Sequence, residues 1–305
     1  MAEVSRKDIE ALVLALDTKV RAGSLSWKTA TNVWAVITKM FKDSVRSKVP
    51  GLRVREDNPC SDVEGPDRGG QRSKAFLFPT ELLKFAEADV VPLEWRRLVA
   101  IAVYLGARAS ELEALEWTDI DLEHGKVNIH QAISRDSRDV TKSTKSDAPR
   151  TFSMEPELMP LLRAMHAEAG GRGRVVREMP RHRDLAEGFR DWLRKAGVDR
   201  PELFISDRTR LNIRFHDLRA TSVTWQTVRG DHPAIIMSRV GHEDFETLKK
   251  YLRQAEVLRP GFGECFPALP PCLLGPGNVP TNRLERAKPS KLLRGGRDSN
   301  PRPPA

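Results

Sequence analysis

The sequence has few of the residues that mark secreted, membrane or metal-binding proteins. Its 305 residues include only three cysteines, Cys60, Cys265 and Cys272. Their number is odd and their spacing is not that of zinc ligands, so we expect reduced thiols without a disulfide framework or a zinc site. The longest apolar run, residues 98–106, is far too short to cross a bilayer. The amino terminus lacks the apolar stretch of a signal peptide, which predicts a cytoplasmic protein with no membrane partner.

Positive charge is the main excess in the composition. The chain has 51 lysines and arginines against 42 aspartates and glutamates, a formal net charge of +9. Such a balance is expected of nucleic-acid-binding proteins, because lysine and arginine release counterions from phosphates. Ribosomal proteins, binders of anionic membranes and merely basic proteins share it, so charge alone leaves these classes open. The length favours two domains.

Apolar spacing predicts a mainly α-helical chain with a small antiparallel β-sheet, an α+β fold. Ile9, Leu12 and Leu16 fall at helical spacing, and Ser26 is a candidate N-cap for the helix that follows it. Residues 126–134 and 150–154 are predicted strands joined through a turn. Helices are expected over residues 5–49, from 79 to 117, from 156 to 192 and from 216 onward.

Composition shifts divide the chain into three parts. Residues 58–73 are rich in proline, glycine and charge, which predicts a linker at the end of a helical domain over residues 1–73. A second domain is expected over residues 74–257. Ten of the 21 prolines lie between Pro260 and Pro304, and no periodic apolar face accompanies them. We therefore expect residues 258–305 to form a largely disordered tail.

Two arginines and a histidine are candidates for phosphate chemistry. Arg108 follows an apolar helix, where an unpaired charge would be costly. Its partner is either Glu111, three residues on, or a phosphate. His216 and Arg219 are three residues apart, so a helix projects both from one face. The arginine fork suits two phosphate oxygens and the histidine exchanges a proton near neutral pH, although an ordinary surface pair has the same spacing.

Further candidates are individually weak. His242 follows Gly241 at a predicted helix end, where a histidine is more often structural. Lys142 and Lys145 lie at a predicted hairpin turn, where lysines usually serve solubility. Tyr251, one of two tyrosines, lies at the margin of an apolar helical stripe and could be a packing residue. That stripe consists of Phe245, Leu248, Leu252 and Ala255.

Taken together, the order and spacing of these residues resemble the tyrosine recombinase (phage integrase) family. The matching motifs are G-x-R-x-x-E-L, a hairpin lysine, H-x-x-R, and G-H with a tyrosine nine residues later. The resemblance covers about residues 75–256, and the preceding residues resemble the core-DNA-binding domain and linker of the family. Ala220 departs from the pattern, since a histidine is common there. The sequence is also expected to begin inside the core-binding domain, without the arm-type DNA-binding domain and first core-binding helix of many phage integrases.

The resemblance implies a role for each of six residues. Arg108 and Arg219 would clamp the scissile phosphate, and Tyr251 would be the nucleophile that forms a 3′-phosphotyrosine bond. His216 would accept a proton. Lys145, which is five residues before Arg150, would protonate the leaving oxygen, with Lys142 as the fallback, and His242 would support the phosphate. No metal or other cofactor is expected, because the arginines would supply the positive charge.

The resemblance further implies a site-specific DNA recombinase that acts on duplex attachment sites as a homotetramer and takes no small-molecule substrate. The alternatives are a truncated or degenerate DNA-binding remnant of an integrase and a type IB topoisomerase-like enzyme. The final residues include Asp298, Ser299, Asn300 and Pro301. The codons GAT-TCG-AAC-CC can encode this run and match the T-arm of a tRNA gene. We hypothesise that the 3′ end of the gene overlaps an attachment site in a tRNA gene.

Overall fold

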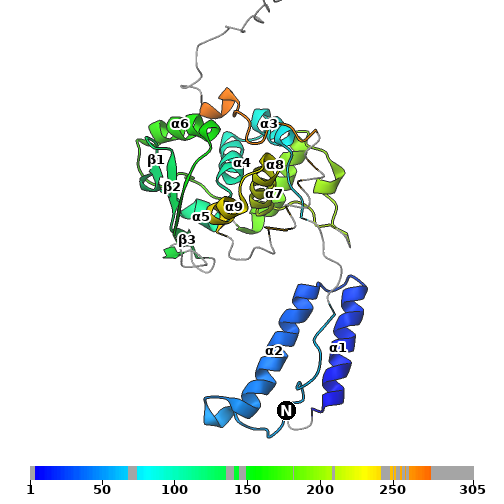
Figure 1. The fold of residues 1–305 in the computed structure, drawn as a ribbon. Coiled ribbons are helices and arrows are strands. Elements are labelled where there is room, and N and C mark those ends of the chain that lie inside the picture. The colour runs from blue at the N-terminus through cyan, green and yellow to red at the C-terminus, as the bar shows by residue number, and fades with distance from the viewer. Residues whose placement is uncertain are drawn as a thin grey trace, which may run out of the picture.

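The computed structural model describes residues 4–67, 74–134, 141–143, 149–180, 182–207, 210–241, 248–249, 251, 255, 258 and 261–275. Helices predominate, and the strands form small antiparallel sheets (Figure 1). The predicted mainly helical α+β fold is therefore confirmed.

The first unit is a helical hairpin. Its helices are α1 (Arg6–Arg21) and α2 (Trp27–Arg46), followed by the 3₁₀ turn η1 (Pro50–Leu52). The Oγ atom of Ser26 accepts a hydrogen bond from the backbone N–H of Thr29 at 3.0 Å, which confirms the predicted N-cap. The buried cluster of this unit is small and contains Ile9, Phe41 and Cys60. The end of the unit packs against its helices, since the Trp27 indole N–H donates to the carbonyl of Pro66 at 3.2 Å.

The second unit is built around helix α8 (Asp217–Arg229). Every residue from Asp217 to Val228 is buried, as expected of a helix covered on all sides. Helix α4 (Leu93–Leu105) packs directly against it, and the two lie in the middle of the unit in Figure 1. The surrounding helices are α3 (Pro79–Glu87), α5 (Ala109–Ala114), α6 (Met159–Ala169), α7 (His182–Lys195) and α9 (Pro233–Val240).

Two short antiparallel sheets flank these helices. Strand β2 (Lys126–Ile129) lies between β1 (Ile120–Asp121) and β5 (Arg150–Ser153), and β3 (Gln131–Ile133) pairs with β4 (Thr141–Ser143). Val127 and Ile129 of β2 are buried, because alternate side chains of a strand face the same side. Ile129 pairs with Arg150, so the first residue of β5 lies beside the core.

The segment after the last long helix folds back onto the second unit. Phe262, Phe266 and Leu273 are buried, and the 3₁₀ turn η5 (Pro271–Leu274) contacts α3, α4 and α6. The sequence predicts disorder from residue 258 onward, and residues 261–275 do not fit that expectation. The reason is that their apolar side chains complete a core built by other elements, so they need no periodic face of their own.

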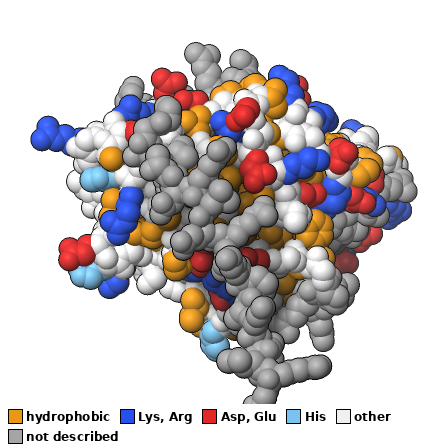
Figure 2. Space-filling view, turned by 90° about the horizontal axis from the view of Figure 1, so that it is seen from above, with side chains coloured by type: hydrophobic (Ala, Val, Ile, Leu, Met, Phe, Trp, Pro, Cys, Tyr) orange, Lys and Arg blue, Asp and Glu red, His pale blue; other side chains and the backbone are white. Residues whose placement is uncertain are grey.

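One face of the molecule has mixed charge. On the face shown in Figure 2, the visible basic and acidic side chains are interspersed, with apolar side chains between them. The positive excess of the composition is therefore not gathered into one field on the visible part of that face. Within the described ranges, none of the helices combines the length and apolarity needed to cross a membrane.

Candidate active site

Three helices meet around Gly106, and two of them, α4 and α9, meet there by their ends. This glycine ends α4 in a left-handed conformation with φ 59°. A Cβ atom there would lie 2.9 Å from Oγ of Ser222 in α8 and 3.2 Å from a methyl of Val240 at the end of α9. Only glycine fits both the backbone conformation and the close approach. The absent side chain thus lets the ends of α4 and α9 pack against α8.

Arg219 joins the same three helices. Its side chain is buried, with Nη1 donating to the carbonyl of Gly106 at 2.9 Å and Nη2 donating to the carbonyl of Val240. Burial and the charge of Arg108 lower the pKa of Arg219 to about 9. The guanidinium remains charged at neutral pH. Each Nη carries two hydrogens, and these backbone contacts use one of each, so donors remain for an anion.

Arg108 lies at the N-terminal end of α5 and is paired with Glu111. Its Nη1 lies 2.7 Å from Oε1 of Glu111, and its backbone N–H donates to Oε2 at 2.8 Å. The structure therefore places Glu111 as the partner that sequence analysis considered. Nε and Nη2 of Arg108 have no hydrogen-bond acceptor among the described residues. The side chain is 24% exposed, which leaves these two nitrogens accessible to an anion.

Glu111 is shared with a second arginine. Arg150 donates from Nη2 to Oε2 of Glu111 at 2.6 Å and from Nη1 to Oε1 at 3.2 Å. Burial alone would raise the pKa of Glu111, but the hydrogen bonds and charges of Arg150 and Arg108 lower the pKa below its usual value. The carboxylate is therefore ionised and lies between two cations.

His216 lies at the N-cap of α8, at the positive end of the helix. Desolvation by its surroundings and the charges of Lys74, Arg219, Arg214 and Arg108 lower its pKa to about 4. Because the side chain of His216 is exposed, we attribute the lowered pKa mainly to these four cations. The imidazole is neutral at physiological pH and can accept a proton.

Tyr251 packs beside the end of α9. It is half-buried against a cluster that contains Val223, Ile236, Val240 and Leu248. Burial and the charge of Asp217 raise its pKa to about 12, while the charge of Arg219 acts in the opposite direction. The arginine thus favours the phenolate, but burial outweighs its effect on the pKa. The tyrosine lies within electrostatic range of Arg219 of the same chain.

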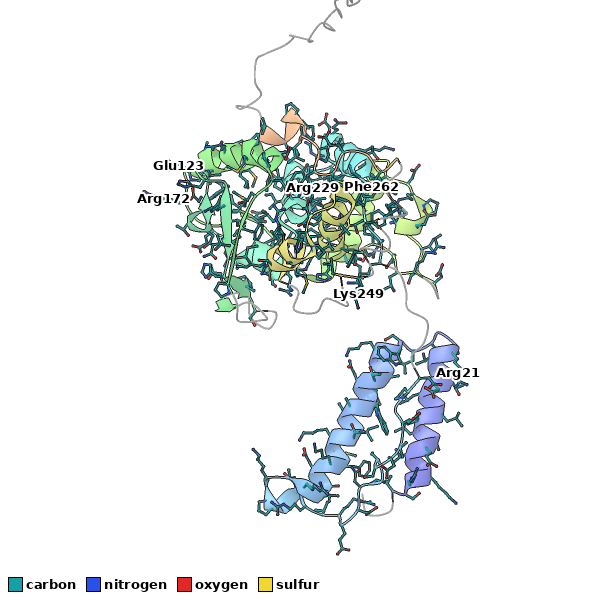
Figure 3. The ribbon with its side chains drawn as sticks, in the orientation of Figure 1. Arg21, Glu123, Arg172, Arg229, Lys249 and Phe262 are labelled. Atoms are coloured by element: carbon teal, nitrogen blue, oxygen red, sulfur yellow. The ribbon has the colours of Figure 1, made fainter. Side chains whose placement is uncertain are left out.

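The structure describes only some of the remaining candidate residues. Lys145 and His242 lie outside the described residues, as do Phe245 and Leu252 of the predicted apolar stripe. Leu248 and Ala255 of that stripe are buried. Lys142 belongs to β4 by its backbone. Lys249, two residues before Tyr251, lies at the margin of the second unit in Figure 3.

Three further groups lie around this cluster, and none belongs to a motif that the sequence shows. Lys74 and Arg214 act on the pKa of His216, and Asp217 is buried with no hydrogen-bond partner for Oδ1 among the described residues. No motif signals Lys74, because only the fold brings it near α8. Asp217 directly follows His216, and its buried position could have been inferred only from the packing of α8 on all sides. Among the described residues, no group of three or more His, Cys, Asp or Glu side chains could hold a metal ion.

Comparisons with known proteins show which family the chain belongs to. Residues 80–257, more than half of the chain, match the model of the phage integrase family. The chain therefore belongs to the phage integrase family, which confirms the resemblance.

Individual relatives extend the similarity. The ICEBs1 integrase of Bacillus subtilis (strain 168) is 25% identical over 235 residues, which cover 73% of this chain and 60% of that protein. The chain thus spans less than two thirds of that relative.

Among solved structures, the Tn1549 transposon integrase in complex with a circular intermediate DNA matches with a TM-score of 0.62 at 18% identity, covering 85% of this chain and 86% of that one. A lambda integrase tetramer bound to a Holliday junction matches with a TM-score of 0.57 at 15% identity, covering 80% and 66%. These two likenesses show a shared fold.

Proposed function

We propose that this chain is a tyrosine-type site-specific DNA recombinase that cuts and rejoins duplex DNA through a 3′-phosphotyrosine intermediate. The observation that carries the proposal is the gathering of Arg108, His216, Arg219 and Tyr251 around one cluster of helix ends. Arg108, the nearby pair His216 and Arg219, and Tyr251 come from three separate parts of the chain. The charges of the two arginines act on the pKa values of the other groups. Membership of the phage integrase family supports the same reaction.

In the proposed reaction the tyrosine oxygen attacks phosphorus and the bond to the 5′-oxygen breaks. The phenol proton passes to neutral His216, and Lys145 gives a proton to the leaving 5′-oxygen. Arg108 and Arg219 stabilise the charge that develops on the non-bridging oxygens. His242 supports the phosphate. The phosphotyrosine bond conserves the energy of the broken phosphodiester, so the reverse steps rejoin DNA without a nucleotide.

Several finer statements belong to the same proposal. The chain would act as a homotetramer on two duplexes in the cytoplasm, in the integration or excision of a phage or mobile element. The lambda integrase structure on a Holliday junction is tetrameric, which supports this assembly. The run Asp298 to Pro301 supports an attachment site in a tRNA gene.

A nicked suicide duplex tests the reaction. The duplex is selected from a randomised pool by binding to the chain and then rebuilt with a nick beside the candidate cleavage position. We expect the chain to form a covalent adduct that survives denaturing electrophoresis and is absent in Tyr251→Phe, because that variant lacks only the nucleophilic oxygen.

Other outcomes identify the alternatives. A chain that binds the selected duplex without any adduct would contradict the proposal and would be a DNA-binding remnant. Relaxation of supercoiled DNA by wild-type chain, without exchange of strands between duplexes, would instead indicate a topoisomerase-like enzyme.

A further inference from the structure

Arg150 occupies a junction between the elements that carry the predicted site residues. It is the first residue of β5, and Lys145 lies five residues before it in the sequence. Its side chain is only 7% exposed, although it carries a full charge. A buried arginine is costly unless each part of its fork is paired, so its partners reveal what it stabilises.

All three nitrogens of this guanidinium have partners. Nη1 and Nη2 bind the two oxygens of Glu111, and Nε donates to the carbonyl of Arg239 at 2.9 Å. Gly241 lies directly beside it, since a Cβ atom there would be 3.5 Å from Cδ and Nη1 of Arg150. Arg150 thus links three parts of the unit. It belongs to β5, it binds Glu111, which also pairs with Arg108, and it contacts the end of α9 that precedes His242 in the sequence.

The charges at this junction have a simple balance. Arg108, Arg150 and Glu111 together carry two positive charges and one negative charge. With Arg150 present, the carboxylate of Glu111 is neutralised by a buried cation, and Arg108 contributes only one Nη and its backbone N–H to that carboxylate. Without Arg150, Glu111 would neutralise Arg108 itself, and the pair would carry no net charge toward a phosphate.

We infer that Arg150 is a positioning residue that neutralises Glu111 so that Arg108 keeps its charge and its two accessible nitrogens for the scissile phosphate. The inference rests on the proposed function for its substrate, a DNA phosphodiester. Its contacts are made to Glu111 and backbone, so it acts through Arg108 rather than on the substrate.

A matched pair elsewhere in the unit provides the control. Arg97 binds Glu168 with Nη1 at 2.6 Å and Nη2 at 2.7 Å, and its Nε donates to the carbonyl of Leu273 at 2.8 Å. The donor pattern is that of Arg150, but here the ion pair joins α4 to α6 and the Nε contact joins α4 to the C-terminal segment. Arg97→Met therefore removes the same kind of fork without touching Arg108.

The test compares single-turnover adduct formation and duplex affinity on the nicked substrate. We expect Arg150→Met to slow adduct formation about 100-fold, as misplacement or loss of a phosphate-binding group does. Adding Glu111→Gln should recover about tenfold of that loss, because the neutral amide no longer cancels the charge of Arg108. Arg97→Met, alone or with Glu168→Gln, should leave the rate of the folded protein within about twofold of wild type, as interactions outside the site do not contribute to the transition state.

Arg150→Lys covers the case in which Arg150→Met does not fold. It keeps the charge that neutralises Glu111 but loses the fork, so we expect it to retain most of the adduct rate. An equal loss in Arg150→Lys and Arg150→Met, or a further loss on adding Glu111→Gln, would overturn the inference.

Duplex affinity separates this inference from the proposed function. If wild-type chain binds the duplex but forms no adduct, the proposed function fails. The affinity of Arg150→Met and its recovery by Glu111→Gln then still decide the role of Arg150, with unchanged affinity in Arg150→Met counting against it.

Discussion

Burial and neighbouring charge shift the proton equilibria of the gathered side chains in different directions. Tyr251, with its pKa raised to about 12, is a neutral phenol in the DNA-free protein. His216, with its pKa lowered to about 4, is a neutral base. Arg219 stays charged, since its pKa falls only to about 9. In the proposed reaction the phenol therefore loses its proton during the attack, and the histidine is in the form that can receive it.

The low pKa of His216 predicts a measurable titration. The unfolded chain should titrate near the ordinary value of 6.5, whereas the folded protein should titrate at about 4. Stability should therefore be lost as the pH falls from 6.5 toward 4, because the unfolded state binds the proton first. Lys74→Gln removes one of the neighbouring cations and should raise the pKa. NMR titration of the imidazole gives the value, with Lys84→Gln as a control on a lysine at the surface of α3. An ordinary pKa in the folded wild type would contradict the prediction.

At the scale of elements, the site depends on how helices end. The left-handed glycines Gly106 and Gly241 end α4 and α9, and the carbonyls beside them accept hydrogen bonds from Arg219. Carbonyls without an intrahelical partner at the end of a helix favour cations. They therefore stabilise Arg219, and the carbonyl of Arg239 in α9 stabilises Arg150 in the same way. The N-terminal end of α8 faces this region and favours an anion. In the proposed reaction, these complementary helix ends would hold the phosphate.

Gly106→Ala tests the importance of that meeting point. The new methyl would clash with Ser222 and force a left-handed backbone on a residue with a Cβ, so we expect a loss of about 2 to 4 kcal/mol in the free energy of unfolding. Gly170→Ala is the matched control, since Gly170 ends α6 at φ 62° with nothing within 4 Å of the new methyl. It should lose only about 1 kcal/mol. Chemical denaturation measures both, and equal losses would show that packing against α8 and α9 contributes nothing.

At the scale of the whole molecule, the second unit has one continuous core that includes the C-terminal segment. Phe266 packs edge-on against Tyr104 and Trp225, with ring centroids 5.3 Å from each, and the guanidinium of Arg229 lies over it. Trp225 belongs to α8, and its indole N–H binds the carbonyl of Leu77. The segment after Tyr251 is thus joined by packing to the helix that carries Arg219.

Phe266→Ala measures how firmly this segment is held. Removal of a buried aromatic ring should lower the free energy of unfolding by about 3 to 5 kcal/mol. Glu264→Ala, at an exposed position of the same segment, should change it by less than about 0.5 kcal/mol. Thermal unfolding followed by circular dichroism checks both. An unchanged melting temperature in Phe266→Ala would mean that the segment is detached in solution.

The sequence by itself determined the local structure and the chemistry of the candidates. Helical spacing, the cap at Ser26 and the glycine at position 241 predicted elements that the structure contains, because these signals act between residues a few positions apart. The motif order also indicated the family correctly. The sequence could not show that Arg150 shares Glu111 with Arg108, that Lys74 lies near His216, or that Phe266 belongs to the core.

Those relations were decided only by tertiary structure. They join residues far apart in the chain, and no local periodicity encodes which distant charges will face each other. The proton affinities follow from the same cause, since burial raises the pKa of Tyr251 and the charges of residues such as Lys74 and Arg108 lower the pKa of His216. The sequence thus identified the candidate side chains, and tertiary packing determined the electrostatic environment around them.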